Sequence, residues 1–437
     1  MLFQSTRRAA PIVTFTEAVA RGLAPDGGLY VPVDYPLFPM SFWQNLRGSD
    51  IHEIAYKLFK EFLIDEFDHA FLKSICSEVF SFKAPIVPIA DRTGVMELFR
   101  GSTLAFKDFG AGFMAKVLPL CKKSSNNRPI TVLTATSGDT GAAVARGFYG
   151  IDGVRVVILY PKGKVSPLQE RQFATLGGNI TTVSVDGTFD DCQRMVKDAF
   201  ADEQLVQDFN LTSANSINIA RLLPQMVYYV YAWSMIPMGA AGKGITFVVP
   251  SGNFGNLVAG LMITKMGLPG VKFIAATNSN DTVPSYLSGE KFEPKKSVQT
   301  ISNAMDVGNP SNFERLTSIF DNKDTMIREN LRGYSVDDEK TKNVIKKVWS
   351  RHNYLVDPHT ATGLDVWNNV MSQPENLGRF GIVLSTAHPA KFREVIDEVL
   401  PGVLKLPTML QDLNSKELLN IDMGASASID AAFLAGI

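Results

Sequence analysis

Short apolar segments rich in β-branched residues alternate with helix-like segments over most of this chain. Each apolar segment has the length and composition of a buried strand, and apolar residues at helical spacing lie between them. We predict strands at residues 130–134, 154–159, 180–185, 245–249, 273–276 and 382–384. Such alternation is typical of α/β domains with a largely parallel sheet. Ligands of these domains bind where strands end and helices begin, so the loops after the strands are the first places to examine.

The part of the chain before about residue 90 has a different pattern. Residues 51–62 and 67–80 carry apolar side chains at helical spacing. Pro85 and Pro88 then interrupt the pattern and mark a boundary. We therefore predict a mainly helical N-terminal domain at residues 1–92 and a second domain at residues 93–437.

Composition and charge argue against several classes of function. The chain has 437 residues, of which 45% are apolar and 20% charged, as in soluble globular proteins with two or three domains. The 43 basic and 44 acidic residues nearly balance, and no basic run is interleaved with aromatic residues. Nucleic acid is therefore not expected as a partner. The five histidines and three widely spaced cysteines match no metal-ligand spacing, so we expect no metal site and free thiols.

One uncharged stretch, residues 222–242, invites a comparison with a membrane span. Pro237 and the small residues after it interrupt the stretch, so a buried helix is the better interpretation. The first residues lack the apolar core and cleavage site of a secretory signal. We therefore expect a cytoplasmic protein without a membrane partner.

A single lysine, Lys107, lies among apolar neighbours that include Phe106, Phe109 and Phe113. Burial disfavours the charged form of an amine, and a neutral amine is a nucleophile that can form a Schiff base with an aldehyde. Alternatively, Lys107 extends from the start of a helix into solvent. This window by itself leaves both interpretations open.

Two loops that follow predicted strands are suited to bind an anion. Residues 134–141 and 250–256 each place small residues before a predicted helix. Free N–H groups and the positive end of the helix dipole favour an anion at such a position. Each loop could instead be an ordinary turn that caps a helix. Neither has the spacing of a nucleotide P-loop, and no dinucleotide-binding glycine pattern follows a strand.

Polar residues in two further segments could complete a ligand site. Asn215 and Asn218 are three residues apart and can share a helix face, although helix capping is an alternative role. Thr386 follows the last predicted strand, and its hydroxyl could donate to a ring nitrogen or could instead cap the next helix. Pyridoxal phosphate needs a lysine for its aldehyde, backbone donors for its phosphate and a partner for its ring nitrogen. The combination therefore indicates a pyridoxal phosphate site.

Four segments resemble those of threonine synthase of the bacterial and fungal type, and they occur in the family's order. They are residues 104–109 (LAFKDF), 137–141 (SGDTG), 251–256 (SGNFGN) and 385–392 (STAHPAKF). Residues 5–7 and 22–29 are similar to the family's N-terminal signature, so the resemblance runs from residue 5 to at least 392. Arg8, where the family often has glycine, is a departure in a loop.

The resemblance implies a tryptophan-synthase-β-like architecture, the fold type II of pyridoxal phosphate enzymes. This α/β fold has parallel-rich sheets in two subdomains, the smaller one inserted at roughly residues 125–215, next to the N-terminal domain. Lys107 would form the Schiff base with the cofactor. The other residues that the resemblance assigns to the cofactor are Gly252, Asn253, Phe254 and Asn256 at the phosphate, Thr386 at the pyridine nitrogen and Asp139 near the ring oxygen. The residues that it assigns to the substrate side are Ser137, Thr140, Asn215 and Asn218.

The activity that the resemblance implies is a lyase reaction, the last step of threonine biosynthesis. O-phospho-L-homoserine and water would give L-threonine and phosphate by γ-elimination and β-hydration. The substrate phosphate needs an anion site of its own, to which Arg100, Lys162 or Arg221 could contribute. The alternative role for each of them is that of a surface charge. Two alternatives remain: a phospho-lyase or serine/threonine dehydratase that releases a keto acid, and a non-catalytic binding protein. The expected assembly is a monomer or a homodimer.

Overall fold

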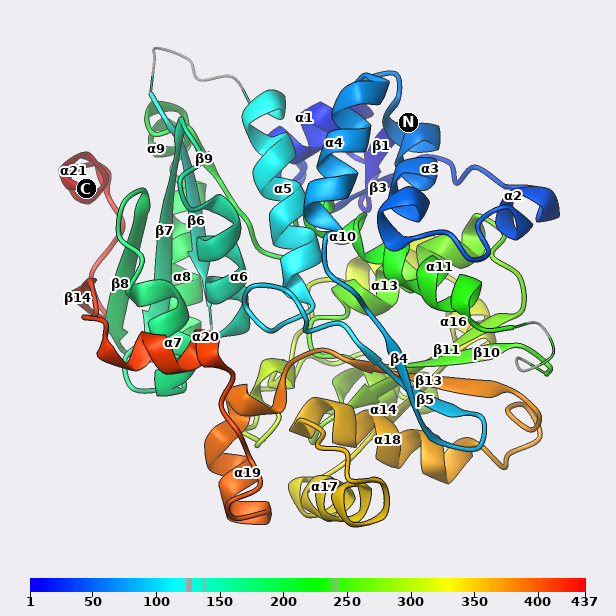
Figure 1. Ribbon diagram of the computed structural model, residues 1–437. Coiled ribbons are helices and arrows are strands. Elements are labelled where there is room, and N and C mark those ends of the chain that lie inside the picture. Colours follow the sequence, from blue (N-terminus) through cyan, green and yellow to red (C-terminus); the bar gives the residue numbers. More distant parts are fainter. Residues whose placement is uncertain (123–127, 137, 238, 240–241) are drawn as a thin grey trace.

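The computed structural model describes residues 1–437 except 123–127, 137, 238, 240 and 241. Within this part of the chain, two large sheets form the centres of two lobes (Figure 1). Helix α5 (Lys107–Cys121) runs between the lobes, and it packs against α6 (Asp139–Phe148) of the smaller one. Lys107, the first residue of α5, therefore lies between elements of the two lobes.

The larger lobe is built on a six-stranded sheet in the order β12-β11-β10-β13-β5-β4. Its strands are β4 (Ile86–Ala90), β5 (Thr93–Glu97), β10 (Ile245–Pro250), β11 (Val271–Thr277), β12 (Leu331–Ser335) and β13 (Phe380–Ser385). β4 is antiparallel to β5, and the remaining pairs are parallel. The carboxyl ends of five strands consequently meet at one edge of the sheet, as expected for a ligand site.

Alternating side chains of β10 face two different hydrophobic cores. Phe247 and Val249 belong to the large core that also contains the N-terminal helices, whereas Val248 belongs to the core under α18 (Pro358–Val370). Because side chains of a strand alternate between its faces, a strand covered on both faces must be apolar throughout. This requirement explains why the central strands are recognisable in the sequence.

The smaller lobe is built on a parallel five-stranded sheet in the order β14-β8-β7-β6-β9. Its strands are β6 (Ile130–Ala135), β7 (Val154–Pro161), β8 (Ile180–Asp186), β9 (Leu211–Thr212) and β14 (Asn420–Gly424). Four of them come from the predicted inserted subdomain, but β14 comes from the C-terminal part of the chain and pairs with β8 at the sheet edge.

The N-terminal part contains a small antiparallel sheet that the sequence analysis did not foresee. Its strands are β1 (Leu2–Ser5), β2 (Val13–Thr14) and β3 (Tyr30–Pro32) in the order β2-β1-β3. These strands are too short for an alternating pattern to stand out. The helices of this part share a core with α5, since Phe15 and Phe59 contact Phe113. β4 and β5 pair across residue 92, and the division into domains at that residue stays a prediction.

The helices surround the sheets as Figure 1 shows. Those described are α1 (Phe15–Arg21), α2 (Met40–Gln44), α3 (Ile51–Leu63), α4 (His69–Val79), α5, α6, α7 (Pro167–Ala174), α8 (Phe189–Ala201), α9 (Glu203–Asp208), α10 (Ile219–Leu222), α11 (Gln225–Met235), α13 (Gly255–Lys265), α14 (Thr282–Ser288), α15 (Phe313–Ile319), α16 (Asp324–Asn330), α17 (Asp338–His352), α18, α19 (Arg393–Val399), α20 (Thr408–Gln411) and α21 (Ala431–Gly436), with 3₁₀ turns η2 (Asn303–Met305), η3 (Pro389–Phe392) and η4 (Asp412–Ser415).

The structure confirms all six predicted strands and the buried helix predicted within residues 222–242, which is α11. Nearly all side chains of this helix are themselves buried, on all of its faces. None of the helices within the described residues has both the length and the apolar character that crossing a membrane requires.

Candidate active site

Strand pairing places Lys107 next to Thr386. The two segments that leave β5 and β13 continue side by side beyond the sheet. The N–H of Phe106 donates to the carbonyl of Thr386 at 2.9 Å, and the N–H of His388 donates to the carbonyl of Leu104 at 3.0 Å. Residues nearly 280 positions apart in the sequence are thereby joined, and α5 begins with Lys107 at this junction.

The surroundings of the Lys107 amine favour its neutral form. Burial, together with the charges of Arg221 and Lys391, lowers its pKa from 10.5 to about 8, although Asp139 acts in the opposite direction. Among the described residues, none forms a hydrogen bond or ion pair with its Nζ atom, which lies 6.0 Å from the centre of the Phe106 ring. At pH 7.5 roughly a quarter of such an amine is neutral. The side chain therefore does not behave as a solvated surface lysine.

The loop after β10 has the shape of an anion cradle. Phe254 adopts a left-handed conformation (φ 60°) immediately before α13 begins at Gly255. A Cβ atom on Gly252 would lie 2.7 Å from both the carbonyl oxygen of Ala304 and the Cα of Met305, so the turn η2 closes over this position. Only glycine fits here without a shift of the backbone.

Asn253 and Asn256 have different roles in this loop. The side chain of Asn253 ties the loop to its surroundings, since Nδ2 donates to Ser216 Oγ at 2.6 Å and Oδ1 accepts from the N–H of Ser311. In Asn256, Oδ1 accepts from the hydroxyls of Tyr228 and Tyr229. Its Nδ2 is buried and has no partner among the described residues.

An unpartnered buried donor at the start of a helix needs an acceptor, because leaving it unpaired costs about 1–3 kcal/mol. A phosphate oxygen meets this need, and the helix dipole of α13 adds to the attraction. The residues present therefore fit the phosphate of pyridoxal phosphate, with Lys107 available for its aldehyde at the same edge of the sheet.

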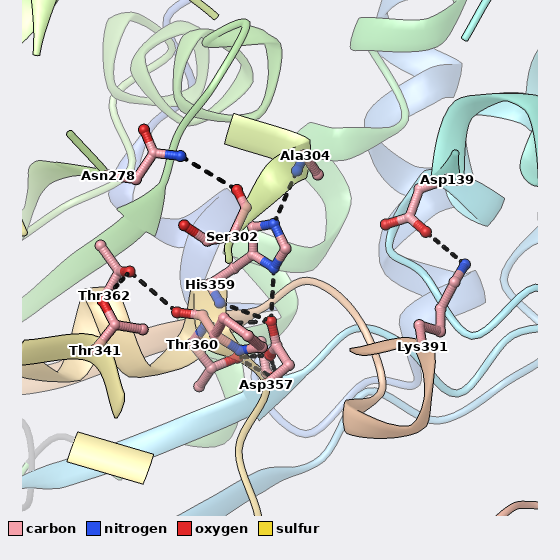
Figure 2. A network of polar contacts seen from close by, with 12 residues as sticks. Asp139, Asn278, Ser302, Ala304, Thr341, Asp357, His359, Thr360, Thr362 and Lys391 are labelled. Carbon is pink, nitrogen blue, oxygen red and sulfur yellow. Dashed lines mark hydrogen bonds and ion pairs between the residues drawn. The ribbon is translucent and has the colours of Figure 1, made fainter. Parts of the chain in front are cut away.

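Asp139 and Lys391 form a buried ion pair near Lys107 (Figure 2). Lys391 Nζ lies 2.6 Å from Asp139 Oδ1, and the amide of Gln169 donates to the same oxygen at 2.9 Å. Burial raises the pKa of Asp139, but Lys391 and Lys107 outweigh burial and hold the pKa well below its usual range. Asp139 is consequently ionised throughout the physiological range. The sequence analysis named Asp139 and missed its partner Lys391.

A second buried network links the cradle to the end of β13 (Figure 2). The N–H of Ala304 donates to His359 Nε2 at 3.2 Å, so the proton of the ring lies on Nδ1, which donates to Asp357 Oδ1 at 2.8 Å. Thr360 Oγ1 contacts Asp357 and lies 2.7 Å from Ser385 Oγ. The sequence analysis considered His359 only as a metal ligand and missed this network.

Comparison with known proteins identifies the family. The family model for pyridoxal-phosphate dependent enzymes matches residues 95–385, and models for the N-terminal and C-terminal parts of threonine synthase match residues 2–80 and 360–429. The threonine synthase of Serratia marcescens is 43% identical over 97% of both chains. The chain belongs to the threonine synthase family.

Solved threonine synthases have the same fold as this chain. The crystal structure of the Escherichia coli enzyme superposes with a TM-score of 0.90 at 42% identity and covers 98% of this chain and 97% of its own. A pyridoxal phosphate-bound threonine synthase from Brucella melitensis gives 0.89 at 33% identity, with 98% and 97% covered. The fold type II architecture and the pyridoxal phosphate cofactor predicted from the sequence are confirmed.

The predicted substrate-side residues of this threonine synthase differ in their surroundings. Thr140 is half-buried in the first turn of α6, and half-buried Asn215 accepts from the Thr134 hydroxyl. Ser137 lies outside the described residues. Asn218 is fully buried and caps α10, where its side chain contacts only backbone groups such as Val19 and Ala220. Capping is the alternative role that the sequence left open for Asn218, and its place on the substrate side stays a prediction.

The three candidates for the substrate-phosphate site differ in their burial and in their ion-pair partners. Arg100 pairs with Glu97 at 2.6 Å, and Lys162 pairs with Asp422 at 2.7 Å on the surface. Arg221 is buried, and its Nε has no partner among the described residues. Of the three, only Arg221 lowers the pKa of Lys107. Its charge therefore acts on this lysine, whereas the charges of Arg100 and Lys162 have no such effect.

Proposed function

We propose that this enzyme converts O-phospho-L-homoserine and water to L-threonine and phosphate, with pyridoxal phosphate attached to Lys107. One observation carries the proposal: a lysine with a pKa of about 8 lies at the same sheet edge as a cradle with an unpaired amide donor. Membership in the threonine synthase family supports the choice of substrate and product.

The cofactor would be held by residues that follow strand ends of both lobes. Gly252, Asn253, Phe254 and Asn256 would bind its phosphate through the free N–H groups at the start of α13 and through Asn256 Nδ2. Thr386 would face the pyridine nitrogen, and Asp139 would lie near the ring oxygen. Because a hydroxyl is too weak an acid to protonate a pyridine, Thr386 would leave that nitrogen neutral. When bound, pyridoxal phosphate supplies an electron sink for negative charge on the substrate carbons.

Lys107 would have two successive roles. At rest it would hold the cofactor, and the substrate amine would then displace it. The freed amine, whose pKa of about 8 is close to the working pH, can take a proton from the α carbon and move protons at the β carbon. Loss of the γ-phosphate and addition of water at the β carbon would complete the reaction. Thr140 and Asn215 would line the substrate side, with Ser137.

A second outcome on the same fold is the release of a keto acid by a phospho-lyase or dehydratase. Both outcomes need the same lysine and the same cradle, so the product decides between them. Holoenzyme supplied with O-phospho-L-homoserine should release threonine and phosphate in equal amounts, measured by amino-acid analysis and a phosphate assay. Phosphate accompanied by 2-oxobutyrate, without threonine, would contradict the proposal and favour the second outcome.

The matched control for this experiment lies on the same helix. Lys107→Ala should abolish both product formation and the visible absorbance of the bound cofactor. Lys116→Ala removes an exposed lysine of α5 that pairs with Glu78, and it should leave both properties unchanged. Threonine formation by the Lys107→Ala variant would rule out the role assigned to this lysine.

We also propose that the enzyme is cytoplasmic and functions as a monomer or a homodimer. Its three cysteines are free thiols, as is usual for proteins of a reducing compartment, and this supports the proposed location. Sedimentation of the purified holoenzyme would distinguish these two states from any larger assembly.

A further inference from the structure

The ion pair between Lys391 and Asp139 is unusual in being fully buried. Every other Lys or Arg ion pair among the described residues has a substantially exposed partner. Burying two charges is a poor route to stability, because the loss of hydration offsets much of their attraction. A buried pair at this location therefore calls for an explanation in terms of the site.

The pair belongs to a ring of contacts that joins the two lobes and is closed by the α7 backbone between Gln169 and Gln172. Besides its contact with Asp139, the Lys391 ammonium donates to the carbonyl of Thr103 at 2.8 Å. Two glutamines of α7 complete the ring: Gln172 donates to the same carbonyl at 3.1 Å, and Gln169 donates to Asp139. Lys391 is the only cation in this ring, so its ammonium determines where the carboxylate of Asp139 is held.

One member of the ring, Thr103, lies four residues before Lys107, the proposed cofactor lysine. Thr103 also anchors the turn ahead of α5, because its N–H donates to Asp108 Oδ2 at 2.8 Å. Displacement of Lys391 would therefore disturb both the Asp139 carboxylate and the backbone that leads to Lys107. Lys391 is therefore connected to the surroundings of Lys107 through two contacts, one with the Asp139 carboxylate and one with the Thr103 carbonyl.

The charged groups that act on Lys107 come from three elements. They are Asp139 on α6, Arg221 on α10 and Lys391 on η3, and Asp108, the next residue on α5, acts in turn on Arg221. Asp139 raises the pKa of Lys107 and Lys391 lowers it, so their effects oppose each other. Removing either partner would leave the charge of the other unbalanced beside Lys107.

We propose that Lys391 is a positioning residue that holds the Asp139 carboxylate against the turn at Thr103 and cancels its charge beside the bond between Lys107 and the cofactor. This inference rests on the proposed attachment of pyridoxal phosphate to Lys107. It adds a residue to the site and gives it a role in setting the protonation of the linkage nitrogen. An unbalanced Asp139 stabilises a proton on that nitrogen, whereas an unbalanced Lys391 opposes one.

The test is a pH titration of the visible absorbance of the cofactor-loaded enzyme. Lys391→Met should raise the midpoint pH, and Asp139→Asn should lower it, each by about one pKa unit, as expected for a nearby charge in a buried site. The double variant, in which both charges are absent, should return close to the wild-type midpoint. Because Lys391→Met leaves a buried carboxylate alone, its folding is checked by thermal unfolding, and Asp139→Asn provides a second measurement if it fails to fold.

A surface lysine provides the matched control. Lys340→Met removes the same charge from an exposed ion pair with Asp337 and should leave the midpoint unchanged. Midpoints that stay at the wild-type value in both single variants, or that move in the same direction, would overturn the positioning role. Failure of the wild-type enzyme to develop visible absorbance with pyridoxal phosphate would instead contradict the proposed cofactor attachment itself.

Discussion

The backbone N–H of Ala304 donates to Nε2 of His359 at 3.2 Å. This single contact connects the turn that closes over Gly252 to the start of α18, where Asp357 holds the opposite side of the ring. Asp357 and Thr360 in turn reach Ser385, the residue before Thr386. A buried neutral histidine therefore links the two ends of the proposed cofactor site, the phosphate cradle and the partner of the ring nitrogen.

Substitution of His359 should consequently weaken cofactor retention. In His359→Leu the Ala304 N–H loses its acceptor and Asp357 loses a donor, so we expect the dissociation constant of pyridoxal phosphate to rise about tenfold, equivalent to about 1.4 kcal/mol. Equilibrium dialysis of the apoenzyme measures this constant. His352→Leu, at an exposed position of α17, is the control and should bind as the wild type does. Equal affinities for both variants would show that the turn is held by other contacts.

The unpaired side-chain amide of Asn256 allows a specific test of where the cofactor phosphate binds. Asn256→Asp preserves the oxygen that accepts from Tyr228 and Tyr229 but replaces the unpaired donor with a group that donates no proton and carries charge. Because two anions then face each other, we expect cofactor affinity to fall by more than tenfold and further than in Asn256→Ala. Retained affinity in the Asp variant would place the phosphate elsewhere.

Gly252 tests the shape of the cradle rather than its charge. In Gly252→Ala the new methyl group would meet the Ala304 carbonyl and Met305 Cα at 2.7 Å, and backbone atoms cannot rotate away as side chains do. We expect a loss of about 1–3 kcal/mol in the free energy of unfolding, together with weaker cofactor binding. Gly424→Ala, where nothing lies within 4 Å of the added atom, should be close to neutral in both urea unfolding and cofactor titration.

The pKa of Lys107 predicts a pH dependence for cofactor attachment. Burial is the main cause that lowers this pKa to about 8, so the neutral, reactive amine increases steeply as pH rises towards 8, is half of the total near pH 8 and levels off about one pH unit above it. The rate at which the apoenzyme gains visible absorbance on mixing with pyridoxal phosphate should follow the same curve. A rate that keeps rising tenfold per pH unit up to pH 10 would show that Lys107 retains the pKa of a solvated lysine.

Local sequence patterns predicted those parts of the fold that are covered on both faces. β6, β7, β8, β10, β11 and β13 all lie at predicted positions, because burial on both faces demands continuous apolar runs. Most of the strands that sequence patterns did not predict are short or lie at sheet edges, such as β1, β9 and β14. β14 in particular has no apolar run in its sequence, NIDMG. It forms a strand because it pairs with β8. β5 is an exception: it is fully buried between β13 and β4, but its five residues include Gly94 and end in Glu97, so no continuous apolar run marks it.

The sequence by itself determined the family, the α/β class and the two segments that define the proposed site, Lys107 with its apolar neighbours and the loop at residues 251–256. Both are local motifs whose chemistry is carried by adjacent residues. Only the tertiary structure decided which polar residues support them. Lys391 meets Asp139, and His359 meets Ala304, across lengths of chain over which no periodicity operates. Such pairs form because strand order and helix packing bring them together, and that information lies in the fold as a whole.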